Sequence, residues 1–154
     1  MTKQVTTILI MLLSNFVLLG QDCIGFHKTP GCKIKDTMGY KLFGQSKSAV
    51  VEAGKTYQYQ AILFGGYDYK LGICTERGFK PIHLKIIDAE KQSVFYDNMD
   101  DDYTETVGFS NEITRSVIFE ITIMASDMEF RDIGDTRVCL GIAIYWHRMP
   151  KLGI

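Results

Sequence analysis

Hydrophobic and polar residues alternate most regularly over residues 115–126, RSVIFEITIMAS. In an extended chain, one side of this segment carries Val117, Phe119, Ile121, Ile123 and Ala125. The other side carries a more mixed set, Ile118, Glu120, Thr122 and Met124. A period of two with many β-branched residues is typical of a β-strand. The pattern therefore predicts a central strand with one face buried in a core and the other face partly exposed to water.

The same alternation recurs along the chain and predicts several more strands. They are expected at residues 48–53, 56–64, 67–74, 81–88, 93–96, 103–109 and 138–147. Gly65-Gly66, which stands between two alternating runs, is typical of a tight β-hairpin. No long segment has the period of an amphipathic helix. About eight strands at this spacing predict an all-β fold, a two-sheet antiparallel β-sandwich of the jelly-roll type.

The N-terminal segment has the features of a secretory signal peptide. Lys3 precedes an apolar run at residues 8–19 that is short for a membrane span, and Gly20 is a small residue suited to cleavage. We therefore expect a signal peptide at 1–20, a disulfide-pinned N-terminal wrap at 21–47 and a sandwich domain at 48–154. An uncleaved anchor and a lipid-modified Cys23 stay open as alternatives, although Asp22 is a poor residue before a lipidation site. Cleavage would leave a periplasmic or secreted protein with no stable membrane insertion.

The nearly neutral charge of the chain argues against a nucleic-acid partner. It carries 17 basic and 18 acidic residues, which give a formal net charge of −1. Nucleic-acid binding and electrostatic docking to a membrane both need a basic surface. The composition therefore predicts no nucleic-acid partner.

All four cysteines follow the predicted signal peptide. An even number of cysteines in an oxidising compartment indicates disulfide bonds. Of the three possible pairings we expect Cys23–Cys32, which closes a local loop, and Cys74–Cys139, which joins two distant strands. A metal site is disfavoured because the chain has no C-x-x-C motif and its three histidines show no ligand spacing.

Acidic residues gather in the loops expected after residues 96 and 126. If consecutive strands run antiparallel, these loops and the loop after residue 74 emerge at the same end of the sandwich. Several loop carboxylates at one end are the ligands that calcium prefers. The candidate calcium ligands are Asp97, Asp100, Asp101, Asp102, Asp127 and Asp132. The other interpretation is that these residues form turns and bind no ion, and no cofactor besides calcium is expected.

Aromatic residues are the candidates for ligand contact. Tyr67, Tyr69 and Trp146 share the parity of neighbouring apolar strand residues, which favours a place in the core. Tyr40, Phe43 and Tyr145 are under no such constraint. They are therefore the predicted contact residues for a sugar or a protein surface.

Four short segments together resemble a known group of proteins. They are Gly54-Lys55-Thr56-Tyr57, Gly66-Tyr67-Asp68-Tyr69 with Cys74, Phe95-Tyr96-Asp97-Asn98, and Cys139-Leu140-Gly141. This set resembles small exported sandwich proteins of Bacteroidetes that have no assigned activity, and more loosely the bacterial pre-peptidase C-terminal domains. The resemblance implies a sandwich fold and an auxiliary or binding role. The chain departs from the pre-peptidase domains in its cysteines and in having no attached protease.

No sequence motif indicates a catalytic centre. The chain contains neither G-x-S-x-G nor H-E-x-x-H, and no glycine-rich phosphate loop precedes a helix. The sequence therefore favours a non-catalytic exported module of the cell envelope that contacts a protein or a glycan. Two alternatives stay open: a calcium-dependent binding module that uses the acidic loops, and a hydrolase of envelope polymers that uses the same carboxylates.

Overall fold

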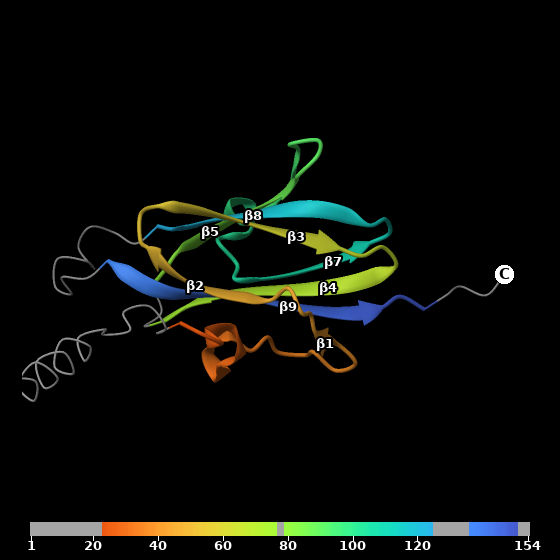
Figure 1. Cartoon of the computed structure of the whole chain (residues 1–154), viewed down its shortest axis with the longest axis horizontal. Coiled ribbons are helices and arrows are strands. Elements are labelled where there is room, and N and C mark those ends of the chain that lie inside the picture. Colours follow the sequence, from red (N-terminus) through yellow and green to blue (C-terminus); the bar gives the residue numbers. More distant parts are fainter. Residues whose placement is uncertain (1–22, 77–78, 125–135, 151–154) are drawn as a thin grey trace, which may run out of the picture.

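The chain forms two antiparallel β-sheets packed face to face (Figure 1). A computed structural model describes residues 23–76, 79–124 and 136–150. The five-stranded sheet contains β1 (Lys41–Leu42), β2 (Lys47–Glu52), β4 (Tyr67–Thr75), β7 (Thr106–Asn111) and β9 (Arg137–Arg148). The four-stranded sheet contains β3 (Thr56–Leu63), β5 (Ile82–Asp88), β6 (Val94–Asp97) and β8 (Arg115–Ile123). The predicted all-β sandwich is confirmed.

The order of the strands is that of a jelly roll. The five-stranded sheet runs β1-β9-β4-β7, with β2 also paired to β9, and the four-stranded sheet runs β3-β8-β5-β6. The antiparallel pairs β2–β9, β3–β8, β4–β7 and β5–β6 are nested like the two arms of one long hairpin. That nesting, folded over into two sheets, is the arrangement of two Greek keys. The additional strand, β1, has only two residues and is too short to produce a sequence pattern.

The core lies between the two sheets, where the inward sides of the strands meet. On β8, which lies between β3 and β5, alternate residues are buried as predicted: Val117, Phe119, Ile121 and Ile123. The opposing sheet contributes Leu71, Ile73, Ile142 and Ile144. Full burial of each such side chain stabilises the fold by about 1.5–3 kcal/mol relative to exposure. This paired apolar surface holds the two layers together.

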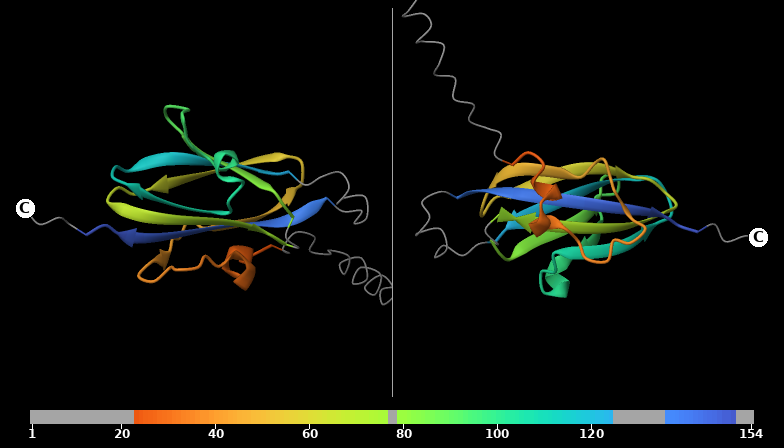
Figure 2. Two further views of the ribbon diagram at one scale, coloured as in Figure 1. Left: turned by 180° about the vertical axis from the view of Figure 1, so that it is seen from behind. Right: turned by 90° about the horizontal axis from the view of Figure 1, so that it is seen from below.

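Residues 23–46 cross the outer face of the five-stranded sheet (Figure 2). They contain the 3-10 turns η1 (Phe26–Lys28) and η2 (Pro30–Cys32) and the short strand β1. Small residues on the sheet allow this close approach. A Cβ atom at Gly72 would lie 2.7 Å from Ile34, and one at Gly141 would lie 2.6 Å from the Cys74 sulfur. The N-terminal segment therefore packs on the glycines of β4 and β9, and part of each strand is buried on both faces.

Two disulfides attach the N-terminal segment to the five-stranded sheet, and their pairing differs from the predicted one. Cys23 bonds to Cys139 on β9, and Cys32 bonds to Cys74 on β4, with a Cα–Cα distance of 5.3 Å in each case. The predicted pairs Cys23–Cys32 and Cys74–Cys139 are wrong. The reason is that the segment lies over two neighbouring strands, so each of its cysteines meets a different strand instead of its neighbour in sequence.

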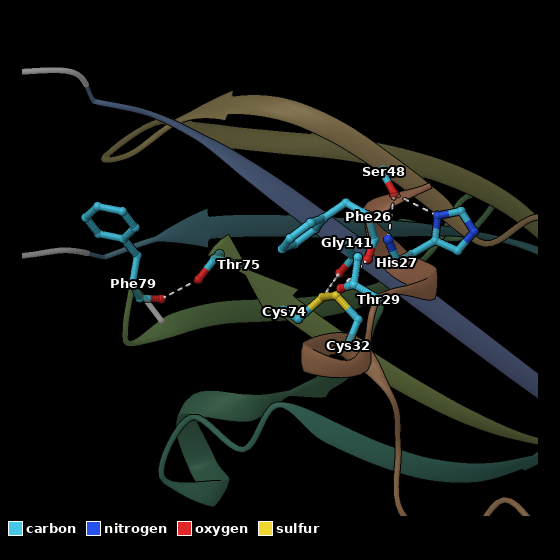
Figure 3. The surroundings of a disulfide bond; sticks show 9 residues. All are labelled: Phe26, His27, Thr29, Cys32, Ser48, Cys74, Thr75, Phe79 and Gly141. Carbon is cyan, nitrogen blue, oxygen red and sulfur yellow. Dashed lines mark hydrogen bonds between the residues drawn. A yellow bond between two sulfur atoms is a disulfide. The ribbon is translucent and has the colours of Figure 1, made fainter. Parts of the chain in front are cut away.

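Hydrogen bonds around the second disulfide complete the attachment (Figure 3). The His27 backbone N–H donates to Ser48 Oγ at 2.8 Å, and His27 Nδ1 lies 2.7 Å from the same oxygen. Burial, followed by the charge of Lys28, lowers the pKa of His27, so the ring accepts a proton less readily than an exposed histidine. We conclude that Ser48, at the start of β2, anchors η1 to the edge of the sheet.

The strand register places the expected loops at one end of the sandwich. The end of β4 pairs with the start of β9, since Thr75 lies opposite Leu140. In the other sheet, the ends of β6 and β8 both lie beside the first half of β5. The predicted grouping of the chain after β4, β6 and β8 is therefore confirmed for the described residues.

The predicted signal peptide at 1–20 lies outside the described residues. Within the described ranges, no helix is long and apolar enough to cross a membrane.

Candidate functional site: a groove between two edge strands

A groove of about 430 Å³ lies between β6 and β7, along one side of the sandwich. These strands are the last of their respective sheets: among the described strands, β6 pairs only with β5 and β7 only with β4. Apolar core side chains line the groove: Leu63, Ile86, Val107, Phe109 and Val117. The groove therefore gives access to the layer between the sheets.

The groove stays open because β6 is short and irregular. It has four residues, and its register with β5 shifts between Ile86 and Ile87, which leaves Phe95 as an extra, bulged residue on β6. Bulges bend an edge strand and re-aim its side chains. The β5–β6 hairpin also projects away from the two layers, as the green loop in Figure 1. As a result Val94 and Phe95 at its base are 54% and 45% exposed.

Arg115 lies at one end of the groove. It is the first residue of β8 and has the inward parity of Val117, so a charged side chain stands at a position that elsewhere is apolar. Its guanidinium carbon lies 4.9 Å from the centre of the Phe95 ring, a cation–π contact. Its Nε is buried and has no hydrogen-bond partner among the described residues. A buried donor without an acceptor costs about 1–3 kcal/mol.

One carboxylate lies close to this arginine, and backbone groups already hold it. Asp88 Oδ1 accepts the backbone N–H groups of Glu90 and Lys91, both at 2.9 Å, and so forms the turn of the β5–β6 hairpin. The Lys91 N–H lowers the pKa of Asp88 most; the Glu90 N–H and the charges of Lys91 and Arg115 act in the same direction, against the effect of burial. Asp88 is therefore an anion in the turn, and no ion pair joins it to Arg115 within 4.0 Å.

The other end of the groove carries a tyrosine–carboxylate pair. Asp101 belongs to the 3-10 turn η4 (Asn98–Asp101), which precedes β7, whereas Arg115 follows β7. The Tyr96 hydroxyl donates to Asp101 Oδ2 at 2.9 Å. Burial, and then the Asp101 carboxylate, raise the pKa of Tyr96 to about 12. The groove thus has a negative end and a positive end, separated by the length of β7.

We expect Tyr96 to be among the last tyrosines to ionise, at about pH 12 instead of pH 10. Asp101→Asn should lower this pKa, because it removes the negative charge that opposes the phenolate. The raised pKa also means that the contribution of Tyr96 to stability is complete below pH 10 and is lost as the pH rises towards 12. Ultraviolet difference titration of the wild type against Tyr96→Phe measures this step, and a step at the ordinary value would contradict the assignment.

The free side of β7 exposes backbone hydrogen-bonding groups to the groove. The Ile73 N–H donates to the Glu105 carbonyl at 2.9 Å, and the register then sets Val107 and Phe109 opposite Leu71 and Tyr69. Because antiparallel residues face their partner alternately, the backbone groups of Gly108 and Ser110 point away from β4. This edge is therefore open to the backbone of another chain.

The predicted contact residues Tyr40, Phe43 and Tyr145 lie on other parts of the molecule. Phe43 is 5% exposed and packs in the core against the rings of Tyr69 and Trp146, so its prediction as a contact residue is wrong. The reason is that β1 directs the chain inward at the end of the sandwich. Tyr40 packs on His147 and under the Lys70 ammonium, and Tyr145 is half-buried on β9 opposite Leu42.

The predicted core positions of the other three aromatic residues are confirmed. Tyr69 is buried, and Tyr67 and Trp146 are partly buried against the core, with their rings stacked at 4.6 Å. The Tyr69 hydroxyl also accepts the Phe64 N–H at 2.8 Å, which satisfies its buried polar atom.

The candidate calcium ligands are partly engaged in turns. Asp97 Oδ1 lies 2.7 Å from His83 Nε2 and accepts the Met99 N–H at 3.0 Å, which makes Asp97 the N-cap of η4. Burial raises the pKa of Asp97, but the Met99 N–H, His83 and Lys85 outweigh it and lower the pKa overall. Asp100, Asp101 and Asp102 are exposed on η4 and its C-cap.

No group of three or more metal-ligating side chains forms among the described residues. Asp127 and Asp132 lie outside those residues. The calcium site therefore stays a prediction.

The sequence does not predict the groove, because the residues that line it come from five strands and a turn. The signals in the sequence were weak: an arginine with the parity of core residues, and a glycine inside β7. Each has several common explanations on its own. Only the gap between the two sheet edges makes Phe95, Tyr96, Asp101 and Arg115 line the same groove.

Comparison with known proteins gives a distant structural likeness. No family model matches the chain, and no curated protein matches it. A similar solved structure is that of PliG from Aeromonas hydrophila, a periplasmic inhibitor of g-type lysozyme. The two chains are 11% identical, the alignment covers 71% of this chain and 87% of PliG, and the TM-score is 0.42. A likeness at this level bears on neither the partner nor the activity of this chain.

Proposed function

We propose that the protein is an exported, non-catalytic binding module of the cell envelope and that its partner is a protein. The observation that carries this proposal is the open groove between the unpaired edges of β6 and β7. Soluble sandwiches usually cover or shorten such edges, because exposed edges recruit other chains. Here a projecting hairpin with exposed Val94 and Phe95 flanks the groove instead.

The two disulfides support export. Disulfides persist in oxidising compartments and are rare in the cytosol. All four cysteines are paired, and both bonds hold the N-terminal segment to the sheet. The resemblance to small exported sandwich proteins implies the same compartment and a binding role.

A glycan partner is less well supported than a protein. Sugar-binding sandwiches offer aromatic rings in a row on an open sheet face. In the four-stranded sheet, the outward positions of β3, β5 and β8 hold other residue types: Thr56, Gln58, Gln60, Ile62, His83, Lys85, Ile87, Ser116, Ile118, Glu120 and Thr122. Many of these are tied to one another, as in the bonds Thr56–Thr122, Gln58–Glu120 and Gln60–Ser116. This face therefore carries polar cross-strand pairs and isoleucines in place of a row of aromatic rings.

A catalytic role for the acidic loops is also less well supported. Asp97 is held by His83 and the Met99 N–H, and Asp101 by the Tyr96 hydroxyl. Carboxylates in these positions organise a turn and the end of a groove. A general acid and base would need free carboxyl groups that face a shared substrate site.

Chemical cross-linking in the native envelope tests the proposal. The mature protein, carrying a photo-reactive side chain in place of Ser93 on the β5–β6 hairpin, should form a discrete cross-link to a protein. The same group in place of Lys33, on the far side of the sandwich, is the matched control and should give less of this product. Retention on polysaccharide columns that Tyr145→Ala abolishes, with no protein cross-link from either position, would contradict the proposal.

A further inference from the structure

We propose that the β6–β7 groove binds an extended segment of the partner protein and pairs a carboxylate of that segment with Arg115. This inference rests on the proposed function and specifies the chemistry of the bound segment. Three independent features of the groove carry it: a free strand edge, an apolar floor and a buried donor without an acceptor.

The free edge of β7 sets the conformation of the bound segment. The backbone groups of Gly108 and Ser110 face the groove, and an extended chain placed beside β7 would continue the five-stranded sheet. From Val107 to Asn111 the edge spans about 14 Å, enough for four or five residues of an extended partner.

The apolar residues that line the groove determine which side chains of the bound segment are apolar. In a strand added to β7, every second side chain would point between the sheets, toward Leu63, Ile86, Val107, Phe109 and Val117. One inward position therefore suits an apolar side chain. The inward position two residues away, about 7 Å along the strand, reaches the Arg115 end of the groove.

Arg115 sets the chemistry of that second position. Its Nε is buried without an acceptor, and the Phe95 ring covers one side of the guanidinium, so its orientation is fixed before binding. No ion pair within 4.0 Å joins Asp88 to Arg115, so this nearby carboxylate leaves the guanidinium available to an incoming group. A carboxylate is the acceptor that forms the strongest hydrogen bonds with a guanidinium.

The negative end of the groove agrees with this polarity. Asp101 and the Tyr96 hydroxyl lie at the opposite end of β7. A carboxylate on the partner is repelled there and attracted at Arg115, so the charges fix the register of the bound segment. The expected sequence is an apolar residue and an acidic residue two positions apart.

Two short peptides probe this chemistry without the natural partner. They are the acetylated and amidated pentapeptides Thr-Val-Thr-Glu-Thr and Thr-Val-Thr-Gln-Thr, titrated into the isotopically labelled mature protein and followed by NMR. The glutamate peptide should bind about tenfold more tightly than the glutamine peptide, because only the carboxylate forms a charge-assisted bond with Arg115. The Arg115 Nε–H resonance itself should move on titration with the glutamate peptide. This readout needs no variant.

Variants separate the contributions of the charge and of the edge. Arg115→Gln should reduce the affinity for the glutamate peptide to that for the glutamine peptide and leave the latter unchanged. Gly108→Pro removes an N–H group that faces the free edge and makes no bond to β4, and it should weaken both peptides. Arg148→Gln removes an arginine from the end of β9, outside the groove, and should change neither.

Three results would overturn the inference: equal affinity for the two peptides, resonance shifts confined to residues that do not line the groove, or no binding at millimolar concentration. Failure here is distinguishable from failure of the proposed function. An envelope cross-link that persists in Arg115→Gln and Gly108→Pro would leave a protein-binding module with a different site. The absence of any protein cross-link would remove the function itself.

Discussion

Replacing Cys23 and Cys139 together by alanine is expected to lower the free energy of unfolding by about 5 kcal/mol. This bond joins residues 116 positions apart, so its loss releases a long loop in the unfolded chain. Most domains of this size are stable by only about 5–15 kcal/mol, and the variant should therefore be close to unfolding at 37 °C. Urea unfolding followed by circular dichroism measures the change.

The second disulfide is the matched control for the first. Cys32→Ala/Cys74→Ala removes a bond that spans 42 positions, and the same chain-entropy model gives a loss of about 4 kcal/mol. Mass spectrometry of unreduced peptides should find the Cys23 peptide attached to the Cys139 peptide. A local Cys23–Cys32 link, or a loss below about 1 kcal/mol in either variant, would contradict the observed pairing.

Asn98→Ala is expected to lower the free energy of unfolding by about 3 kcal/mol or more. Asn98 is 0% exposed, and its side chain makes three hydrogen bonds to the backbone. Oδ1 accepts the Leu84 N–H at 2.8 Å, and Nδ2 donates to the Ile82 and Thr104 carbonyl oxygens at 2.9 and 3.0 Å. Alanine leaves these backbone groups without partners, and an unsatisfied buried group costs about 1–3 kcal/mol.

Asp100→Ala, in the same 3-10 turn, is the control for Asn98→Ala. Asp100 is exposed, so its replacement should change the stability by about 0.5 kcal/mol or less. Asn98 connects β5 to η4 and thereby holds Asp101 at the end of the groove. Asn98→Ala should therefore also weaken any partner that binds there. If Asn98→Ala is no more destabilised than Asp100→Ala, the buried amide is not the link between these elements.

The strands and their inward faces could be predicted from the sequence because both depend on local pattern. Residues 115–126 illustrate this: a period of two identified β8, and the same parity identified its buried residues. The prediction that β4, β6 and β8 end at the same end of the sandwich followed from antiparallel succession alone. These features need no knowledge of which strands lie side by side.

The disulfide pairing could not be predicted because it depends on where a segment without periodicity lies. Residues 23–46 pack against Gly72 and Gly141. This contact depends on β4 and β9 being neighbours in the sheet, which the sequence does not indicate. The prediction of Phe43 as a contact residue is wrong for the same reason: it lies in a segment without periodicity. A two-residue strand with no pattern of its own directs its ring into the core.

The groove depends on a property of the complete fold, the distance between the last strands of two sheets. Arg115 was visible in the sequence only as a charged residue at an inward position. Its significance comes from the bulged β6, which places Phe95 over it and leaves its Nε buried without an acceptor. Neither the bulge nor the gap has a signature in the sequence.

Amide hydrogen exchange on the protein bound to its cross-linked envelope partner tests the central claim most directly. The N–H groups of Gly108 and Ser110, which face the free edge, should exchange rapidly in the isolated protein and become protected in the complex. Those of Val107 and Phe109, which face β4, should be protected in both states. Protection that appears elsewhere on the sandwich, with Gly108 and Ser110 still exchanging rapidly, would contradict the assignment of this groove as the binding site.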